Sequence, residues 1–155
     1  MNREEQVITG FRGLLNKIVR LNKFKMEDSL KGYKPSEVHC IEYIGKNTDP
    51  NVTKLAEAFY MTNGAISKMA KKLIKKDLIE SYQKPDNKKE IYFRLTEHGK
   101  KVYEIHEKLH KEFQKRDKPV FEQISEEQFR SILSFIKSYN KHLDEEIKKL
   151  NTKSK

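Results

Sequence analysis

The chain has 155 residues, enough for one domain with a hydrophobic core, although only 35% of them are apolar. Lys and Arg total 33 against 23 Asp and Glu, and this formal charge of +10 favours acidic partners, nucleic acid before an anionic membrane. The sequence has no run of about 18 apolar residues, no apolar signal core in MNREEQVITG and a single cysteine, Cys40, which excludes a transmembrane helix and an internal disulfide; we expect a cytoplasmic protein.

The first predicted element is an amphipathic helix that ends near Asp28. Its apolar residues recur at the spacing of one helix face: Val7, Ile8, Phe11, Leu14, Leu15, Ile18 and Val19. The segment KGYKP predicts a loop, and a second helix begins near Pro35, a residue suited to a first helical turn. We expect Val38, Ile41 and Ile44 to form the buried stripe of this second helix.

Two short helices and a hairpin follow the turn TDPN. The first short helix is VTKLAEAFY, and the second follows the N-cap Thr62 and runs through NGAISKMAKKLIKK. The buried stripe of this second short helix is Ile66, Met69, Ala70 and Leu73. LIESYQK and EIYFRL predict two strands, because Ile91, Phe93 and Leu95 alternate on one face, and PDNK predicts the turn between them.

The last two predicted helices follow Thr96, which can cap the first of them. Pro119 is expected to break or restart that helix, and Ser125 with Gln128 forms the capping box that opens the last one. Residues 1–28 and 97–150 form long amphipathic helices, and the small module 35–96 cannot cover all of their apolar faces. We therefore predict that these helices dimerise with a second copy of the chain. The predicted fold is a single domain, 1–155, mainly α with a small β-hairpin wing: a winged helix-turn-helix flanked by N- and C-terminal dimerisation helices.

Positive charge gathers where a winged helix-turn-helix would meet DNA, with eight lysines against three acids between Asn63 and Lys89. The N-terminus of a recognition helix usually meets base edges, and later turns and the wing meet the backbone or the minor groove. The expected DNA contacts are therefore Thr62, Asn63, Gly64, Ser67 and Lys68 near that N-terminus, Lys71, Lys72, Lys75 and Lys76 beyond it, and Lys88 and Lys89 at the hairpin tip. In the alternative, these lysines form a solvated face of a structural or interaction protein.

The run from VTKLAEAFY to LTEHGKK resembles the winged-helix module of MarR-family transcription regulators, and LTEHG resembles the family's L-T-x-x-G. The resemblance covers nearly the whole chain and implies a homodimer on a pseudopalindromic operator, usually acting as a repressor. The chain departs from the family at Tyr60 and Asp77, where glycine is usual. It also departs in the wing, where Asp86-Asn87-Lys88-Lys89 lacks the family's arginine. The wing therefore offers the compact ammonium charge of lysine in place of a planar guanidinium that can donate two hydrogen bonds at once.

The stretch HEKLH, residues 106–110, fits the H-E-x-x-H pattern of zinc proteases. Two histidines four apart on a helix share one face and can bind the same zinc ion. The position after a wing and the lack of a clear downstream third ligand argue against a peptidase, and we predict that the chain is not an enzyme. Resemblance to a zinc-responsive branch of the family implies instead a regulatory site of His39, His106, His110 and Glu27. The alternative is chance spacing, with His39 a satisfied buried histidine.

The sequence also offers two other candidate effector sites. Cys40 could act as a redox switch, although a buried, inert cysteine is the commoner outcome. Phe24, Tyr33, Tyr43 and Tyr103 could line a pocket for a small phenolic ligand, as a crevice of the family does, or could belong to the core.

Overall fold

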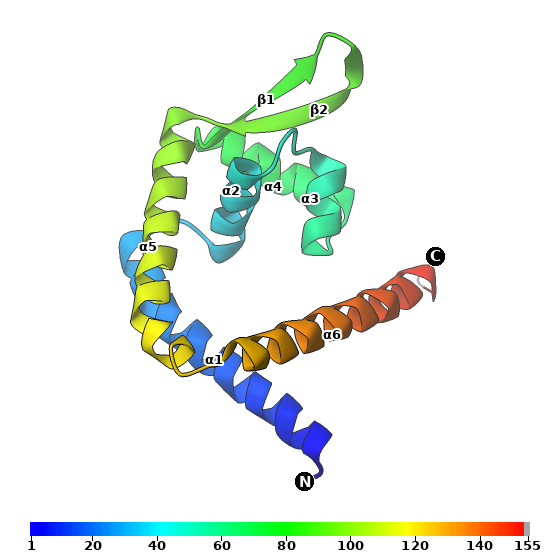
Figure 1. Cartoon of the computed structure of the whole chain (residues 1–155). Helices are drawn as coiled ribbons and strands as arrows, with labels where there is room; N and C mark the ends of the chain where they lie inside the picture. The colour runs from blue at the N-terminus through cyan, green and yellow to red at the C-terminus, as the bar shows by residue number, and fades with distance from the viewer. Residues whose placement is uncertain (154–155) are drawn as a thin grey trace. The chain divides into compact units, whose positions relative to one another are not determined.

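The computed structural model describes residues 1–153, which form six helices and one two-stranded sheet (Figure 1). In chain order these are α1 (Arg3–Ser29), α2 (Pro35–Lys46), α3 (Val52–Phe59), α4 (Asn63–Lys75), β1 (Ile79–Lys84), β2 (Asn87–Leu95), α5 (Glu97–Phe121) and α6 (Glu126–Lys153). The predicted fold class is confirmed. Contacts within the chain define two compact units, Met1–Phe113 and a second from Gln114 onward. No helix in residues 1–153 combines the length and apolar character needed to cross a bilayer.

Most helices begin where side chains can satisfy the first free backbone N–H groups. The Thr62 hydroxyl accepts from Ala65 N at 3.1 Å, and the Thr96 hydroxyl accepts from Gly99 N at 3.0 Å. Ser125 and Gln128 form the predicted capping box, with contacts of 3.2 and 2.9 Å. The expectation that Pro119 breaks the preceding helix was wrong, because α5 continues to Phe121. The proline lies in the last turn, where a missing backbone N–H interrupts little of the helix.

The core of the first unit lies between α2, α4, the root of the hairpin and α5. The predicted stripes of α2 and α4 are buried, with Ile41 at 1% exposure and Ile66 and Leu73 at 0%, except for Met69 of α4, which is partly buried. The other buried apolar residues include Val38, Ile44, Leu55, Ala70, Leu78, Ile79, Phe93, Val102, Leu109 and Phe113. The winged module and the first part of α5 therefore share one continuous core.

The hairpin is antiparallel and extends beyond this core. Its register runs from Ile79 opposite Leu95 to Lys84 opposite Asn87, with an irregularity between Tyr82 and Lys84. The turn is Pro85–Asp86 alone, shorter than the PDNK predicted, so Lys88 and Lys89 belong to β2. Ile91 shares a face with Phe93 and Leu95 but does not join the core. Ile91 is 48% exposed because it lies past the core, whereas Tyr92 on the opposite face is 8% exposed and bridges to Asn51.

Gly99, in the first turn of α5, lies directly against the backbone of Leu78. A Cβ at this position would lie 1.9 Å from Leu78 O, and that carbonyl is held by a 3.1 Å hydrogen bond from Thr96 N. We expect Gly99→Ala to lower the free energy of unfolding by about 1–3 kcal/mol, the usual cost of overpacking, measured by urea denaturation. Gly64→Ala is the control: no atom lies within 4 Å of its Cβ, so a gain of about 0.4–1 kcal/mol is expected. Equal effects of the two substitutions would contradict this account.

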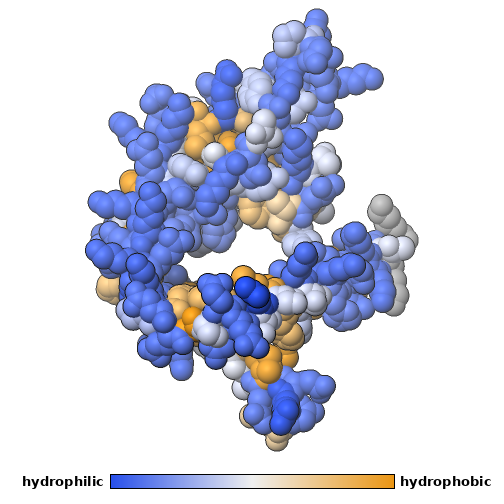
Figure 2. All heavy atoms as spheres, in the orientation of Figure 1, coloured by the Kyte–Doolittle hydropathy of each residue, from blue (hydrophilic) through white to orange (hydrophobic). Residues whose placement is uncertain are grey.

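The long helices α1 and α6 expose much apolar surface. None of the residues of α1, all of which the structure describes, is buried. Its apolar residues between 37% and 60% exposed are Val7, Phe11, Leu14, Leu15, Ile18 and Val19, whereas Ile8 is half-buried. In the second unit, α6 exposes Ile132, Leu133, Phe135, Ile136, Leu143 and Leu150. Figure 2 shows the contrast between the hydrophilic surface of the hairpin and the hydrophobic side chains that reach the surface of the long helices. A soluble monomer rarely exposes contiguous apolar surface of this extent.

Candidate nucleic-acid interface and metal cluster

Helix α4 separates the residues expected to contact DNA from those that hold the helix in place. Ile66, Ala70 and Leu73 face the core. Outside that stripe, Lys68, Lys71, Lys72 and Lys75 are exposed, as are Thr62, Asn63 and Gly64 at the N-terminus, whereas Ser67 is half-buried. The expected contacts thus lie on an outward face, with Ser67 at its edge.

The turn before α4 fixes the direction of the helix. Tyr60 ends α3 in the left-handed region at φ 53°, where the family usually has glycine, and Asp77 after α4 has φ 60°. A tyrosine at positive φ is strained, and an aspartate tolerates the same region better. Leu55 of α3 and Ile66 of α4 are both 0% exposed, so packing between the two helices maintains the turn.

Lys76 differs from the other lysines at this end of α4. Its Nζ lies 2.8 Å from Glu37 Oε2, and Glu37 is only 4% exposed and also accepts from Lys34 N at 3.1 Å. Burial raises the pKa of the Glu37 carboxyl, but the hydrogen bonds from Lys76 and Lys34 outweigh it, and the pKa is lowered overall. Lys76 therefore ties the end of α4 to the start of α2. Its side chain is 42% exposed, and its contact with a phosphate stays a prediction.

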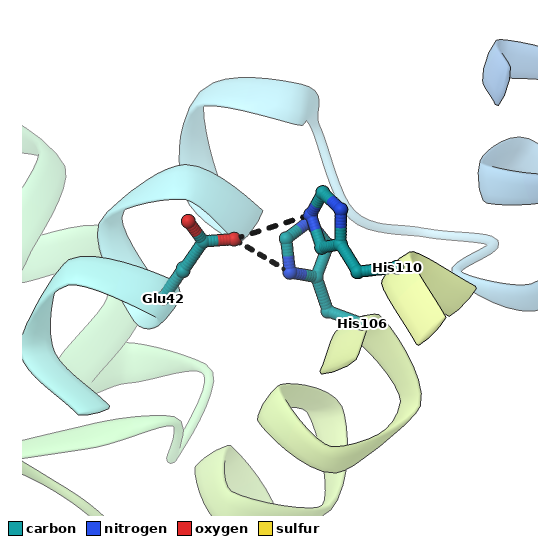
Figure 3. A group of neighbouring side chains, drawn as sticks. All are labelled: Glu42, His106 and His110. Carbon is teal, nitrogen blue, oxygen red and sulfur yellow. Dashed lines mark hydrogen bonds and ion pairs between the residues drawn. The ribbon is translucent and has the colours of Figure 1, made fainter. Parts of the chain in front are cut away.

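The histidines of HEKLH meet a carboxylate of α2 (Figure 3). His106 Nδ1 lies 2.8 Å from Glu42 Oε2, His110 Nε2 lies 3.5 Å from the same oxygen, and the two imidazole Nε2 atoms are 3.2 Å apart. His106 is 3% exposed, and the His110 side chain is 45% exposed. Among residues 1–153 these three groups place one ligand atom each within 4.8 Å of one another. We call them the Glu42 cluster.

This donor set fits a divalent metal ion. Glu42 Oε2 and His106 Nδ1 are buried, and despite their proximity neither makes a hydrogen bond of acceptable geometry within the described residues. Burial lowers the pKa of His106, with the nearby His110 and His39 acting in the same direction and Glu42 opposing them. A neutral imidazole is the form that binds metal. Two histidines and a carboxylate also match the ligands that zinc takes in proteins.

Only part of the predicted zinc set is brought together. His106 and His110 converge, but the carboxylate beside them is Glu42 and not Glu27, which lies on the exposed surface of α1 with its Oε1 3.7 Å from Lys23 Nζ. His39 is exposed on α2 and near enough to influence the charge of His106, but it is not one of the three converging groups. One signal in the sequence pointed to Glu42: it follows His39 by three residues, so both lie on one side of α2.

The residues of the other two effector hypotheses are also placed. Cys40 is 1% exposed, and burial raises the pKa of its thiol to about 12, which disfavours the reactive thiolate. Tyr33, Tyr43 and Tyr103 are half-buried against the core, and the Tyr33 hydroxyl lies 3.0 Å from His98 Nε2. Phe24 is 80% exposed and does not join them in the core.

Comparison with known proteins gives consistent relatives. Residues 34–91 match the model of the MarR family. The HTH-type transcriptional regulator PchR of Bacillus subtilis (strain 168) is 33% identical over 111 residues, which are 72% of this chain and 66% of that protein. The uncharacterized HTH-type transcriptional regulator YhjH of the same organism is 36% identical over 93 residues, 60% of this chain and 53% of that protein. The chain thus spans between about half and two thirds of the length of these relatives.

The fold has counterparts among solved structures. FabT of Streptococcus pneumoniae in complex with DNA superposes with a TM-score of 0.78 at 18% identity, covering 92% of this chain and 98% of FabT. The match extends well beyond the winged module, to the long helices on either side of it. PchR and YhjH are named as transcriptional regulators and not as peptidases, in agreement with the prediction that the chain is not an enzyme.

Proposed function

Because the chain belongs to the MarR family of winged-helix transcriptional regulators, we propose that it binds a pseudopalindromic DNA operator as a homodimer and represses transcription. The observation that carries this proposal is the outward lysine face of α4 beside an exposed hairpin. A dimer bound across a promoter would exclude RNA polymerase from the same DNA, which is the physical basis for repression.

The proposed dimer rests on the apolar surfaces of α1 and α6. Pairing of these surfaces with a second copy would remove from water the side chains that a single chain leaves exposed. A two-fold axis would also place the two α4 helices about 34–36 Å apart, the distance between successive major grooves. Each half of a palindromic operator would then meet the same residues, Lys68 and Lys71 among them.

The direct test of DNA binding starts from random-sequence DNA, because the operator is not known. The full-length protein is used to select duplexes from a random library, and the affinity for the selected duplex is compared with that for unselected DNA at one fixed salt concentration. Enrichment of an inverted repeat supports the proposal. The absence of any preferred sequence, or a preference without two-fold symmetry, would count against it.

A charge placed in the stripe of α6 should separate the proposed protomers. Leu133 is 62% exposed in the single chain, and in a dimer its replacement by glutamate would place a carboxylate in an apolar contact. We expect Leu133→Glu to weaken dimerisation by about 100-fold or more, equivalent to at least about 2.7 kcal/mol, measured by sedimentation at several protein concentrations. Ser138→Glu, an equal charge off the stripe by helix periodicity, is the control and should leave the dimer unchanged. A monomeric wild type would overturn the dimer itself.

We further propose that a divalent metal ion of the zinc type modulates DNA binding. The Glu42 cluster supports this proposal. Glu42 Oε2 and His106 Nδ1 are buried without a hydrogen bond in the described residues, and the cluster brings together side chains of α2 and α5. Glu42, His106 and His110 would hold the ion, which supplies a fixed positive charge and a bond between α2 and α5. For regulation, the ion must bind the DNA-competent state and the other state with different affinities.

The alternative effector is a small phenolic ligand beside Tyr33, Tyr43 and Tyr103. These rings are half-buried against the core, so a ligand there would have to displace existing contacts with the core. Oxidation of Cys40 has less support, because the thiol is buried and its pKa is raised. The metal proposal is favoured because it alone gives a partner to Glu42 Oε2 and His106 Nδ1, which are buried without a hydrogen bond in the described residues.

A further inference from the structure

The loop between α2 and α3 contacts the hairpin through Asp49. One carboxylate oxygen, Oδ1, accepts a 2.8 Å hydrogen bond from the Tyr82 hydroxyl, and the other, Oδ2, pairs with Lys84 Nζ at 2.5 Å. Lys84 and Tyr82 both belong to β1, and Lys84 is the last residue before the turn at Pro85–Asp86. Asp49 therefore holds the strand of the wing close to its tip.

Other contacts from the same loop hold the wing nearer its root. Phe93 N donates to Pro50 O at 2.9 Å, and Asn51 forms an isolated antiparallel β-bridge with Tyr92. The Asn51 side chain also caps α3, accepting from Lys54 N at 2.8 Å. The loop thus joins the wing to the first helix of the helix-turn-helix, and Asp49 is the contact that lies farthest toward the tip.

The ion pair also removes one lysine from the surface that meets DNA. Besides pairing with Asp49, Lys84 Nζ lies 5.0 Å from the centre of the Tyr92 ring. Arg94 is held in a similar way, over the Tyr82 ring at 4.9 Å and 2.7 Å from Glu80. The exposed lysines of β2 are Lys88 and Lys89, directly after the turn. Delivery of these two charges to DNA depends on where the tip of the wing is placed.

We propose that Asp49 is a positioning residue for DNA binding, which holds the wing through Tyr82 and Lys84 so that Lys88 and Lys89 reach the operator. This inference rests on the proposed function. Asp49 itself adopts φ 49°, a conformation that aspartate and asparagine accept more readily than most residues. The loop conformation and the side-chain contact are therefore separable, because asparagine can keep the first while losing the ion pair.

The test breaks the contact without changing the net charge. Asp49→Asn alone would release the Lys84 charge and strengthen non-specific binding, so it is combined with Lys84→Met, and the two changes cancel in charge. The probe is the duplex selected by the wild-type protein from a random library. We expect the double variant to bind it about 30-fold more weakly, because a dimer would lose about one phosphate contact in each protomer. Tyr82→Phe, which removes a single hydrogen bond, should give a smaller loss in the same direction.

A double-mutant cycle distinguishes positioning from general destabilisation. Lys88→Ala/Lys89→Ala should weaken binding in the wild type, but should cost at least threefold less in the Asp49→Asn/Lys84→Met background, because the tip is already misplaced. The exposed pair Glu97 and Lys100, 3.3 Å apart, gives the charge-matched control Glu97→Gln/Lys100→Met, which should bind as the wild type does.

Two failures are distinguishable. If the wild type selects an operator but the Asp49→Asn/Lys84→Met variant binds it equally well, or the losses in the cycle are additive, the role of Asp49 is overturned and the proposed function stands. If the wild type selects no sequence, the proposed function fails and the role of Asp49 in DNA binding fails with it.

Discussion

Lys71→Ala/Lys75→Ala is expected to weaken binding to the selected operator by about 10³-fold, because a dimer would lose four phosphate contacts at about 1 kcal/mol each. Both lysines are exposed on α4, outside its buried stripe. The plot of log affinity against log salt should become shallower by about 3.6, since each lost contact removes about 0.9 from the slope. The loss should be similar for different operator sequences, because phosphate contacts do not read bases.

The matched control removes the same charge from another surface. Lys101→Ala/Lys111→Ala changes two exposed lysines of α5 and should leave affinity within a few-fold of the wild type. For the wild type, roughly 6–10 phosphate contacts predict a loss of about 10³–10⁵ in affinity between 50 and 200 mM salt. A shallow salt dependence, or equal losses in the α4 and α5 variants, would show that α4 does not lie on DNA.

The second large effect is expected at the Glu42 cluster. In chelator-treated protein, His106→Ala/His110→Ala should weaken zinc binding by more than about 100-fold, the upper range found when only outer-shell partners are lost. Glu42→Gln should weaken it in the same direction, measured by competition with a metal indicator. Glu27→Gln is the matched control and should have no effect, because Glu27 lies on the exposed surface of α1.

The pH dependence of zinc binding follows from the lowered pKa of His106. The imidazole must be neutral to bind, and burial keeps it neutral to a lower pH than an exposed histidine. Zinc affinity should fall as the pH is lowered, because protons compete for both imidazoles, and the part of this loss that comes from His106 should set in at a lower pH than for an exposed histidine. If zinc also modulates DNA binding, operator DNA must change zinc affinity by the same factor. Unchanged operator affinity on zinc titration would remove the metal from the proposed function.

Local patterns in the sequence were sufficient for most of the fold. The spacing of Ile66, Ala70 and Leu73 gave the inward face of α4, and the caps at Thr62 and Ser125 gave two helix starts. These features depend on residues within about one turn of each other, so they can be read from the chain. Ile91 shows the limit, because strand alternation says which residues share a face but not how far the core extends beneath it.

The candidate sites depended on contacts between distant segments. His106 and His110 were found because they are four residues apart, but their carboxylate partner lies more than 60 residues earlier, on a helix whose orientation only tertiary packing decides. Asp49 was part of a predicted turn, and nothing local shows that it meets β1 more than 30 residues later. For such contacts the sequence supplies candidate donors and charges, and the fold determines which of them meet.

The end of α2 lies between the two sites. Glu42 and Lys46 of α2 contact His106 and Glu107 of α5, and only Asn47 and Thr48 separate Lys46 from Asp49 at the wing. Because α2 is a continuous helix, a tilt of α2 would move Glu42 in the metal cluster and Asp49 in the following loop together. If zinc modulates DNA binding through α2, a substitution that loosens residues 47–48, which belong to neither proposed site, should leave zinc binding and DNA binding intact but remove the effect of zinc on DNA affinity.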